Sequence, residues 1–194
     1  GGGAAGLVSS YIGAAVNAKV ALIEKHKMGG DCLNTGCVPS KALIKTAHFV
    51  EEARQSKRLG IQKTELTFDF SDVMRRVRRI IKKIEPHDSV ERYTKLGVTC
   101  LQGSARVVSP WTVSYEGSSG KQEISARSII IAAGARPIVP HLPNLSEVEY
   151  ATSDTIWDLN KLPNNLIVIG GGAIGSELAP VSYTHLTLPT ILLV

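Results

Sequence analysis

Two kinds of apolar pattern alternate along the chain. Helix-forming segments with periodic apolar positions cover 4–16, 41–58 and 71–84, whereas short apolar runs occur at 19–24, 129–132 and 166–169. The first pattern predicts helices, and the second, next to glycine or proline, predicts buried strands. Their alternation predicts an α/β fold in which helices cover a mostly parallel sheet.

The two longer helices are expected to bury one face each. In the helix over 41–58, the inward residues are Ala42, Leu43, Ala47, Val50 and Ala53. In the helix over 71–84, which Ser71 or Asp72 can cap and Pro86 interrupts, they are Val73, Val77, Ile80, Ile81 and Ile84. The rest of this helix carries Arg75, Arg76, Arg78, Arg79, Lys82 and Lys83. No aromatic residues interleave with these charges, so we interpret them as a solvated face and expect no nucleic-acid partner.

Short β-rich runs follow from residue 98 to residue 132. Turn residues at Gly103, Ser109–Pro110 and 117–120 divide them, which predicts a three-stranded meander that returns to the central sheet. A buried strand over 129–132 comes next, and a proline-rich stretch from Arg136 to Pro143 marks a domain crossing. A short helix over 153–159 and a strand over 166–169 then open a second domain.

Two glycine fingerprints point to dinucleotide binding. Gly1, Gly3 and Gly6 precede the first helix, and the same spacing recurs at Gly170, Gly172 and Gly175. Glycines at these positions let the backbone approach a pyrophosphate at a helix N-terminus, and an acidic residue about 20 positions later binds a ribose hydroxyl. Glu24 stands at that distance from the first fingerprint. The chain is thus expected to hold two dinucleotides.

Cys32 and Cys37 suggest redox chemistry. Five helical residues rise about 7.5 Å, whereas the Cα atoms of a disulfide lie roughly 4.4–6.8 Å apart, so a bond between the two requires Gly36 to distort the turn. Strained, accessible disulfides are of the labile, catalytic kind. Two unrelated reduced cysteines are the alternative. Cys100 lies in an apolar run and is interpreted as a small buried residue.

Two longer motifs carry a family resemblance. Gly-Gly-x-Cys-Leu-Asn-x-Gly-Cys-Val-Pro-Ser-Lys matches residues 29–41, and Ala-x-Gly-x-x-Pro matches residues 132–137. The chain, from residue 1 to about 179, resembles the flavin-dependent pyridine nucleotide-disulfide oxidoreductases, above all the mercuric reductase and dihydrolipoyl dehydrogenase branch. The resemblance implies a doubly wound, Rossmann-like FAD-binding domain over 1–143 that lacks its first strand. The start of an NAD(P)-binding domain follows over 144–180.

The resemblance also assigns roles to individual residues. Cys32 is the interchange thiol, Cys37 is the thiol beside the flavin, and Lys41 lies near both, paired with Glu177. Two departures from the family pattern are Asp31, where relatives often carry threonine beside the pyrophosphate, and Ala133, which lacks a hydroxyl. The implied cofactor-binding residues are Gly1, Gly3, Gly6, Glu24, Gly30, Asp31, Cys32, Lys41, Gly103, Ala132, Ala133, Gly134, Gly170, Gly172 and Gly175.

The function that this resemblance implies is electron transfer from NAD(P)H through FAD to a Cys32/Cys37 disulfide. Electrons then pass to a small-molecule disulfide or to Hg(II), or run in reverse when dihydrolipoamide is oxidised by NAD. The parent protein is expected to be a homodimer, whereas the chain as given, truncated at both ends, is expected to be inactive. A non-catalytic FAD-binding redox sensor and a truncated relic are the alternatives. Residues 181–194 lack charge and helical period and are interpreted as a non-native tail.

Composition adds little to this picture. A net charge of +5, a pI near 9.2 and 43% hydrophobic residues fit a globular chain with a mildly basic surface. No apolar stretch approaches the roughly 20 residues of a membrane span, so no membrane association is expected. The histidines at 26, 48, 87 and 141 have no metal-ligand spacing. Redox chemistry fed by NAD(P)H fits a reducing cytoplasm.

Overall fold

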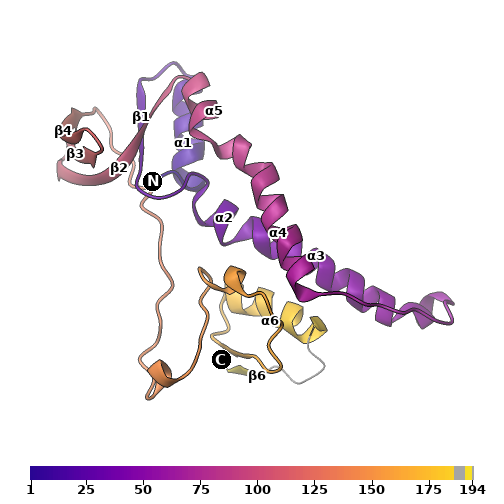
Figure 1. Cartoon of the computed structure of the whole chain (residues 1–194). Coiled ribbons are helices and arrows are strands. Elements are labelled where there is room, and N and C mark those ends of the chain that lie inside the picture. The colour runs from indigo at the N-terminus through magenta and orange to yellow at the C-terminus, as the bar shows by residue number, and fades with distance from the viewer. Residues whose placement is uncertain (186–190, 194) are drawn as a thin grey trace. The chain divides into compact units, whose positions relative to one another are not determined.

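The structure, a computed structural model, describes residues 1–185 and 191–193 (Figure 1). The chain divides into two compact units, each built from two segments that are distant in sequence. The first unit comprises Gly1–Asn34 and Lys82–Arg136, and the second comprises Thr35–Ile81 and Pro137–Val194. The mixed α/β composition with a Rossmann-like sheet confirms the predicted fold class, whereas the domain boundary at residue 143 stays a prediction.

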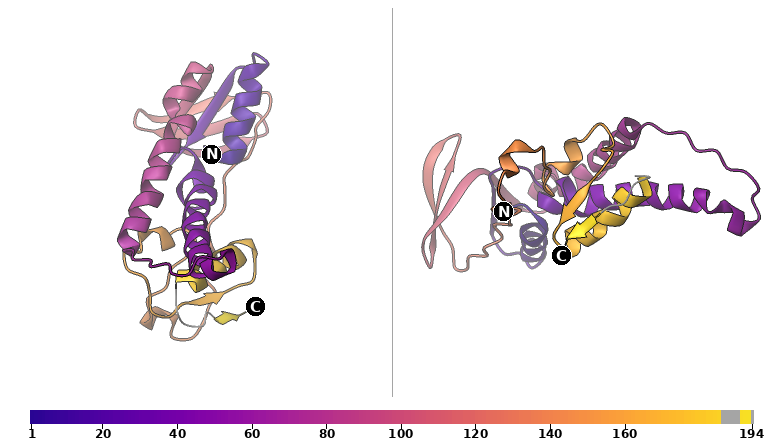
Figure 2. Two further views of the ribbon diagram at one scale, coloured as in Figure 1. Left: turned by 90° about the vertical axis from the view of Figure 1, so that its right-hand side faces the viewer. Right: turned by 90° about the horizontal axis from the view of Figure 1, so that it is seen from below.

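The first unit is built on a four-stranded sheet in the order β1-β2-β3-β4, seen in Figures 1 and 2. The strands are β1 (Val20–Glu24), β2 (Val98–Ser109), β3 (Thr112–Gly117) and β4 (Gly120–Ser125). β1 pairs parallel to the first half of β2, and the second half of β2 pairs antiparallel to β3. The long strand β2 thereby joins the parallel part of the sheet to the predicted three-stranded meander.

Helices cover the parallel part of this sheet. α1 (Ala4–Ala15) packs against β1, α5 (Val90–Lys95) packs against β2, and the short α2 (Gly30–Asn34) follows β1 in sequence. The core between these elements consists of Leu7, Leu22, Tyr93 and Val98, with Cys100 half-buried at its edge. Burial raises the pKa of the Cys100 thiol. This thiol therefore packs as a small apolar group.

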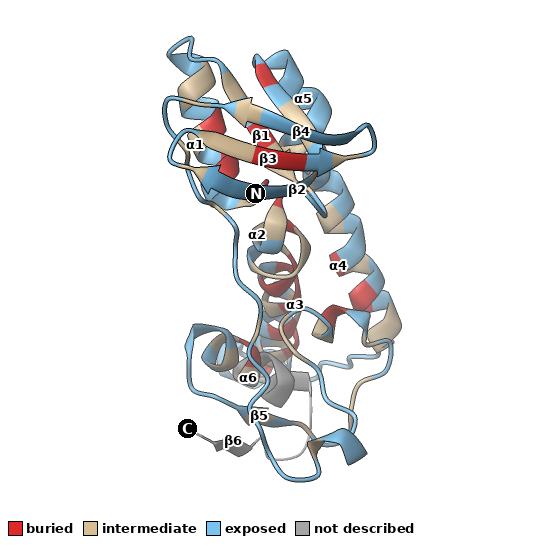
Figure 3. Ribbon diagram, turned by 90° about the vertical axis from the view of Figure 1, so that its left-hand side faces the viewer, coloured by how far each residue is buried: buried red, intermediate tan, exposed pale blue. Residues whose placement is uncertain are grey.

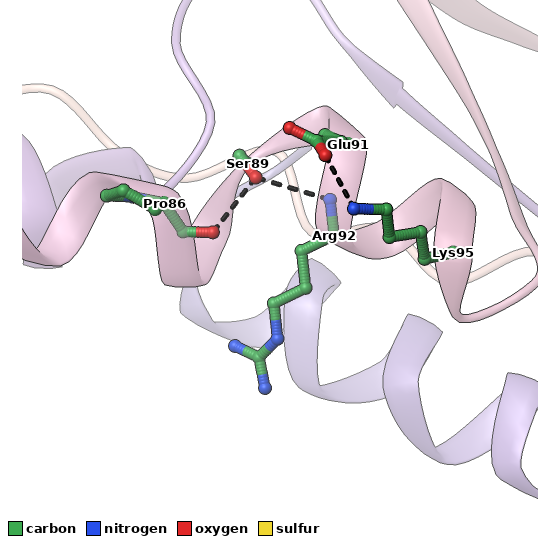
Figure 4. A network of polar contacts seen from close by, with 5 residues as sticks. All are labelled: Pro86, Ser89, Glu91, Arg92 and Lys95. Carbon is green, nitrogen blue, oxygen red and sulfur yellow. Dashed lines mark hydrogen bonds and ion pairs between the residues drawn. The ribbon is translucent and has the colours of Figure 1, made fainter.

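A serine cap explains why a new helix begins shortly after Pro86 (Figure 4). α4 (Phe70–Ile84) gives way to a 3₁₀ turn over Glu85–Asp88, and α5 begins two residues later. The Ser89 hydroxyl accepts a hydrogen bond from the Arg92 N–H at 3.2 Å and donates one to the Pro86 carbonyl at 2.9 Å. These bonds satisfy a free N–H at the start of α5 and tie the proline turn to it.

The second unit is mainly helical. Its elements are α3 (Cys37–Arg54), a 3₁₀ turn over Ser56–Leu59, most of α4, 3₁₀ turns over Leu145–Glu147 and Ile156–Asp158, β5 (Ile167–Ile169), α6 (Ala173–His185) and β6 (Ile191–Leu193). Figure 3 shows the buried faces of α3 and α4 in red. The core contains Ala42, Leu43, Ala47, Val73, Met74, Val77, Trp157 and Leu178. The inward faces predicted for both helices are thus confirmed in part, because Ala53, Ile80, Ile81 and Ile84 are only half-buried.

Two details of α4 differ from the prediction. Asp69 caps the helix, because its Oδ1 accepts a hydrogen bond from the Ser71 N–H at 2.7 Å, so the choice of Ser71 or Asp72 was wrong. This bond lowers the pKa of Asp69. Arg76 is not part of a solvated face, because its guanidinium donates to the Ala42 carbonyl at 2.8 Å and to the Thr46 hydroxyl at 3.2 Å. It fastens α4 to α3.

The predicted strand over 129–132 is absent from the described part of the chain, where this segment has no ladder pairing. Ile130 and Ile131 are 67% and 77% exposed. An apolar run becomes a strand only when a neighbouring strand accepts its backbone hydrogen bonds. Among residues 1–185 and 191–193, no strand pairs with the free edge of β1. Likewise, the helix expected over 153–159 is only the 3₁₀ turn over Ile156–Asp158.

The second fingerprint is followed by more structure than the sequence predicted. Residues 181–194 were expected to lack a helical period, but α6 (Ala173–His185) continues through 181–185, and β6 pairs parallel to β5. Proline removes one helical hydrogen bond, yet its fixed φ is compatible with helical geometry. The resulting β5–α6–β6 arrangement resembles the start of a nucleotide-binding unit. The non-native origin of residues 181–194 stays a prediction, and 186–190 and 194 lie outside the described residues.

Candidate dinucleotide cradle and thiol site

The first fingerprint forms a backbone cradle, which we define as Gly1, Gly3, Gly6 and Gly30. Gly3 is the N-cap of α1, and its carbonyl accepts the first helical bond, from the Leu7 N–H at 2.9 Å. No side chain caps this end of the helix. The first N–H groups of an α-helix have no acceptor within the helix, so they are available to an anion.

Close approach of the backbone explains the glycines. A Cβ built on Gly30, whose φ is +53°, would lie 2.5 Å from the Gly3 Cα. A Cβ on Gly6 would collide with the Gly1 carbonyl, and one on Gly1 would collide with the Ala132 carbonyl. The Gly29 N–H donates to the Gly2 carbonyl at 2.8 Å and holds the two loops together. Because glycine has no side chain, the backbone of the cradle stays open. Such an open backbone surface fits the pyrophosphate of a dinucleotide such as FAD.

Glu24, at the end of β1, has its carboxylate bound to the cradle loop. One oxygen accepts from the Gly2 N–H at 2.5 Å and the other from the His26 N–H at 2.6 Å. Burial acts to raise the pKa of Glu24, but these backbone hydrogen bonds outweigh it, and the pKa is lowered. The carboxylate therefore fixes the loop. Binding of a ribose by Glu24 stays a prediction.

This arrangement predicts a pH dependence. Because the pKa of Glu24 is lower in the folded state, its contribution to stability is present above the unfolded value of 4.5 and is lost as the pH falls through the folded pKa. Glu24→Gln should reduce the free energy of unfolding at pH 7 by less than about 1 kcal/mol, because the site is largely solvent-screened. The difference from wild type should vanish at low pH. Urea unfolding between pH 7 and pH 3 measures it, and a constant difference would contradict the prediction.

Five further residues were predicted to contact the cofactor, and the structure places only some of them beside the cradle. Ala132 abuts Gly1, and the Ala133 Cα would lie 3.7 Å from a Cβ built there. Gly134 has a φ of +74°, and Asp31 is exposed in the first turn of α2. Gly103 has a separate reason to be glycine, because a Cβ there would collide with the Glu116 carbonyl and the Tyr115 ring. Flavin contact by Gly103 stays a prediction.

The second fingerprint repeats the geometry of the first. A Cβ on Gly175 would collide with the Gly170 carbonyl, as a Cβ on Gly6 would with the Gly1 carbonyl. The Ser176 N–H donates to the Gly172 carbonyl at 2.9 Å, which matches the bond between Leu7 and Gly3. Gly170 has a φ of +109°. Both sequence motifs therefore fold into the same turn at the start of a helix.

The thiol site, defined as Cys37, Lys41 and Glu177, lies in the second unit. Cys37 is the first residue of α3, is exposed and carries a free thiol. Lys41 follows one helical turn later, and its ammonium group donates to the Glu177 carboxylate of α6. The hydrogen bond that Lys41 donates to Glu177 raises the pKa of Lys41, and the negative charge of the Glu177 carboxylate adds to this. The structure thus brings these three predicted residues together, while Cys32 is half-buried in α2 of the first unit.

Two side chains near the cysteine motif escaped the sequence analysis. The Asn34 side-chain amide donates to the Gly30 carbonyl at 2.8 Å and to the Met28 carbonyl at 3.1 Å, which stabilises the loop around Gly30. The Trp157 indole N–H donates to the Thr35 carbonyl at 2.7 Å. Asn34 stood inside the quoted motif, but Trp157 is 122 positions from its acceptor, and no local pattern links the two.

Two other kinds of feature are absent from the described residues. Within 1–185 and 191–193, three or more histidine, cysteine or acidic side chains do not gather where they could bind a metal ion. No helix in the same ranges has the length and apolar character needed to cross a membrane.

Comparisons with known proteins agree with this geometry. The family described as Pyridine nucleotide-disulphide oxidoreductase matches residues 1–186. A mercuric reductase from Bacillus cereus is 34% identical over 178 residues, which cover 92% of this chain and 28% of the relative. A dihydrolipoyl dehydrogenase from Geobacillus stearothermophilus is 37% identical and covers 99% of this chain, which corresponds to 40% of the relative. The chain therefore spans less than half the length of these relatives.

A solved structure shows the same fold. It is the Cu(II) complex of a cysteine-to-serine mutant of the HOCl-induced flavoprotein disulfide reductase RclA from Escherichia coli. It matches with a TM-score of 0.79 and 24% identity, over 96% of this chain and 39% of that one.

Proposed function

Because the chain belongs to the pyridine nucleotide-disulphide oxidoreductase family, we propose that the protein containing it transfers electrons between NAD(P)H and a thiol, disulfide or metal-ion substrate. FAD and a redox-active Cys32/Cys37 pair carry the electrons in this proposal. The observation that carries it is the thiol site, where Cys37 begins a helix and Lys41, one turn later, is held by Glu177. Lys41 and Glu177 are 136 positions apart, so the fold has joined the cysteine motif to the helix of the second fingerprint.

In this proposal, each group of residues has a separate role in binding FAD or in transferring electrons. The cradle residues would hold the FAD pyrophosphate through backbone N–H groups at the start of α1. FAD, when bound, supplies a two-electron relay between the nicotinamide and the disulfide. Reduction by two electrons breaks the Cys32–Cys37 bond and leaves two thiolates, each of which takes up one proton or attacks the substrate. Lys41 places a positive charge near Cys37, and Glu177 keeps its ammonium group in position.

Two substrate classes are favoured by the names of the relatives. A mercuric reductase would pass electrons outward to Hg(II), whereas a dihydrolipoyl dehydrogenase runs in reverse, because dihydrolipoamide reduces the disulfide and NAD finally accepts the electrons. A small disulfide is the third choice. We propose a homodimer in a reducing cytoplasm for the full-length protein.

Steady-state kinetics of the full-length protein test the proposal. We expect many turnovers of NADH or NADPH oxidation with Hg(II) or a disulfide, or of NAD reduction with dihydrolipoamide. A protein that binds FAD, is reduced once and then stalls with every substrate would instead be a redox sensor. If the full-length protein binds no FAD, it is neither an oxidoreductase nor an FAD-binding redox sensor. That result would support the alternative of an inactive relic.

A further inference from the structure

Trp157 contacts the cysteine motif from a distant part of the sequence. Its side chain is 7% exposed and packs in the core of the second unit, among residues of α3 and α4. The indole N–H is shared between the Thr35 carbonyl at 2.7 Å and the Ser153 carbonyl at 2.8 Å. The Thr35 carbonyl thus accepts a hydrogen bond from a side chain that is fixed in the core, and this bond restrains that carbonyl.

The turn that presents the indole is held without help from Thr35. The Ile156 N–H donates to the Thr152 carbonyl at 3.0 Å, and the Thr152 N–H donates to the Thr155 hydroxyl at 2.9 Å. Trp157 follows this turn directly and is fixed by the core around it. The indole therefore acts as an anchor, and the Thr35 carbonyl is the group that it holds.

Little chain separates this anchor from the thiol. Gly36 follows Thr35 as the N-cap of α3, has no side-chain cap, and accepts the Ser40 N–H at 2.9 Å. Cys37 is the next residue and the first of α3. Closing a disulfide between residues five apart requires the intervening backbone to tighten relative to a helix. With the Thr35 carbonyl fixed, that adjustment falls on the other intervening residues, Leu33, Asn34 and Gly36.

We infer that Trp157 is a positioning residue that holds the Cys32–Cys37 segment through Thr35 and thereby favours the dithiol over the disulfide. The inference rests on the proposed function, because it gives the pair a redox role. An anchor of this kind makes the disulfide easier to reduce, which suits a group that accepts electrons from FAD and passes them on.

A glutathione titration tests the inference without FAD or NAD(P)H. Two glutathione thiols become one glutathione disulfide while the Cys32–Cys37 bond breaks and its two sulfurs gain two electrons and two protons. The population of each state is read from the mass of the alkylated protein, with Cys100→Ala as the background. Trp157→Phe keeps an aromatic ring in the core but removes the N–H. We expect the equilibrium to shift about tenfold toward the disulfide, which is about 30 mV for a two-electron couple.

Trp111→Phe is the matched control. It replaces the second of the two tryptophans, which is 62% exposed in the turn between β2 and β3, and should shift the equilibrium by less than about twofold. An equilibrium in Trp157→Phe equal to that of the control would overturn the inference and leave the proposed function standing. If the wild-type chain forms no Cys32–Cys37 disulfide at any glutathione ratio, the proposed function itself fails.

A second measurement covers the case in which Trp157→Phe does not fold. In the Trp111→Phe protein, Trp157 is the sole tryptophan and reports on its own surroundings. If the Thr35 carbonyl moves when the disulfide closes, the emission of Trp157 should change between the oxidised and the reduced protein. Identical spectra in the two states would overturn the inference.

Discussion

Replacing Cys37 by serine in the full-length protein is expected to lower NAD(P)H-dependent turnover by roughly a thousandfold or more, because a hydroxyl can neither form the disulfide nor release electrons by thiolate exchange. FAD binding should persist, since the backbone groups of the cradle belong to the first unit and Cys37 belongs to the second. The measurement is the steady-state rate with the best substrate, alongside the flavin absorbance of the purified variant.

Cys100→Ser is the control for this experiment. Cys100 is half-buried in β2 at the edge of the core of the first unit, and a hydroxyl there should affect stability slightly and turnover little. Turnover that is unchanged in Cys37→Ser would rule out the dithiol mechanism. A loss of turnover in both variants to the same degree would show that thiol chemistry at Cys37 is not the cause.

Gly30→Ala is expected to have the second largest effect, because it places a Cβ against backbone that cannot move aside. The new atom would lie 2.5 Å from the Gly3 Cα, and the residue has a φ of +53°. We expect the free energy of unfolding to fall by roughly 2–5 kcal/mol, from backbone strain and overpacking combined. In the full-length protein, FAD affinity should weaken roughly a hundredfold or more, since the loops of the cradle must separate.

Gly97→Ala is the control that separates the cost of a positive φ from the cost of a steric clash between the new Cβ and neighbouring backbone. Gly97 also has a positive φ, +88°, but nothing lies within 4 Å of a Cβ built there. It should cost about 1–2 kcal/mol and leave FAD affinity unchanged. Urea unfolding and flavin fluorescence titration measure both quantities. If Gly30→Ala and Gly97→Ala lose the same free energy of unfolding and the same FAD affinity, the close approach of Gly3 and Gly30 contributes nothing to either quantity.

Local patterns were sufficient for much of the fold. The apolar faces of α3 and α4, the meander of β2, β3 and β4, and both glycine turns follow from periods and turn residues that lie within a few positions of each other. Family membership likewise rests on contiguous motifs. These features could be predicted because helix periodicity and glycine geometry are properties of short segments.

Errors arose where the outcome depends on a partner. The run over 129–132 has the composition of a strand but finds no neighbouring strand in the described ranges. Arg76 has the sequence context of a solvated basic face, yet the Ala42 carbonyl accepts its hydrogen bond. A single sequence does not show which distant backbone group will be available.

The sequence by itself therefore determined the α/β class, the family, and the identity of the residues in both fingerprints and in the cysteine motif. Only the tertiary structure decided that Gly3 meets Gly30, that Glu24 binds the Gly2 N–H, and that Trp157 holds the Thr35 carbonyl. The reason is physical: propensity and periodicity act within a few residues, whereas these contacts form between segments that only the packed core brings within hydrogen-bonding or van der Waals distance.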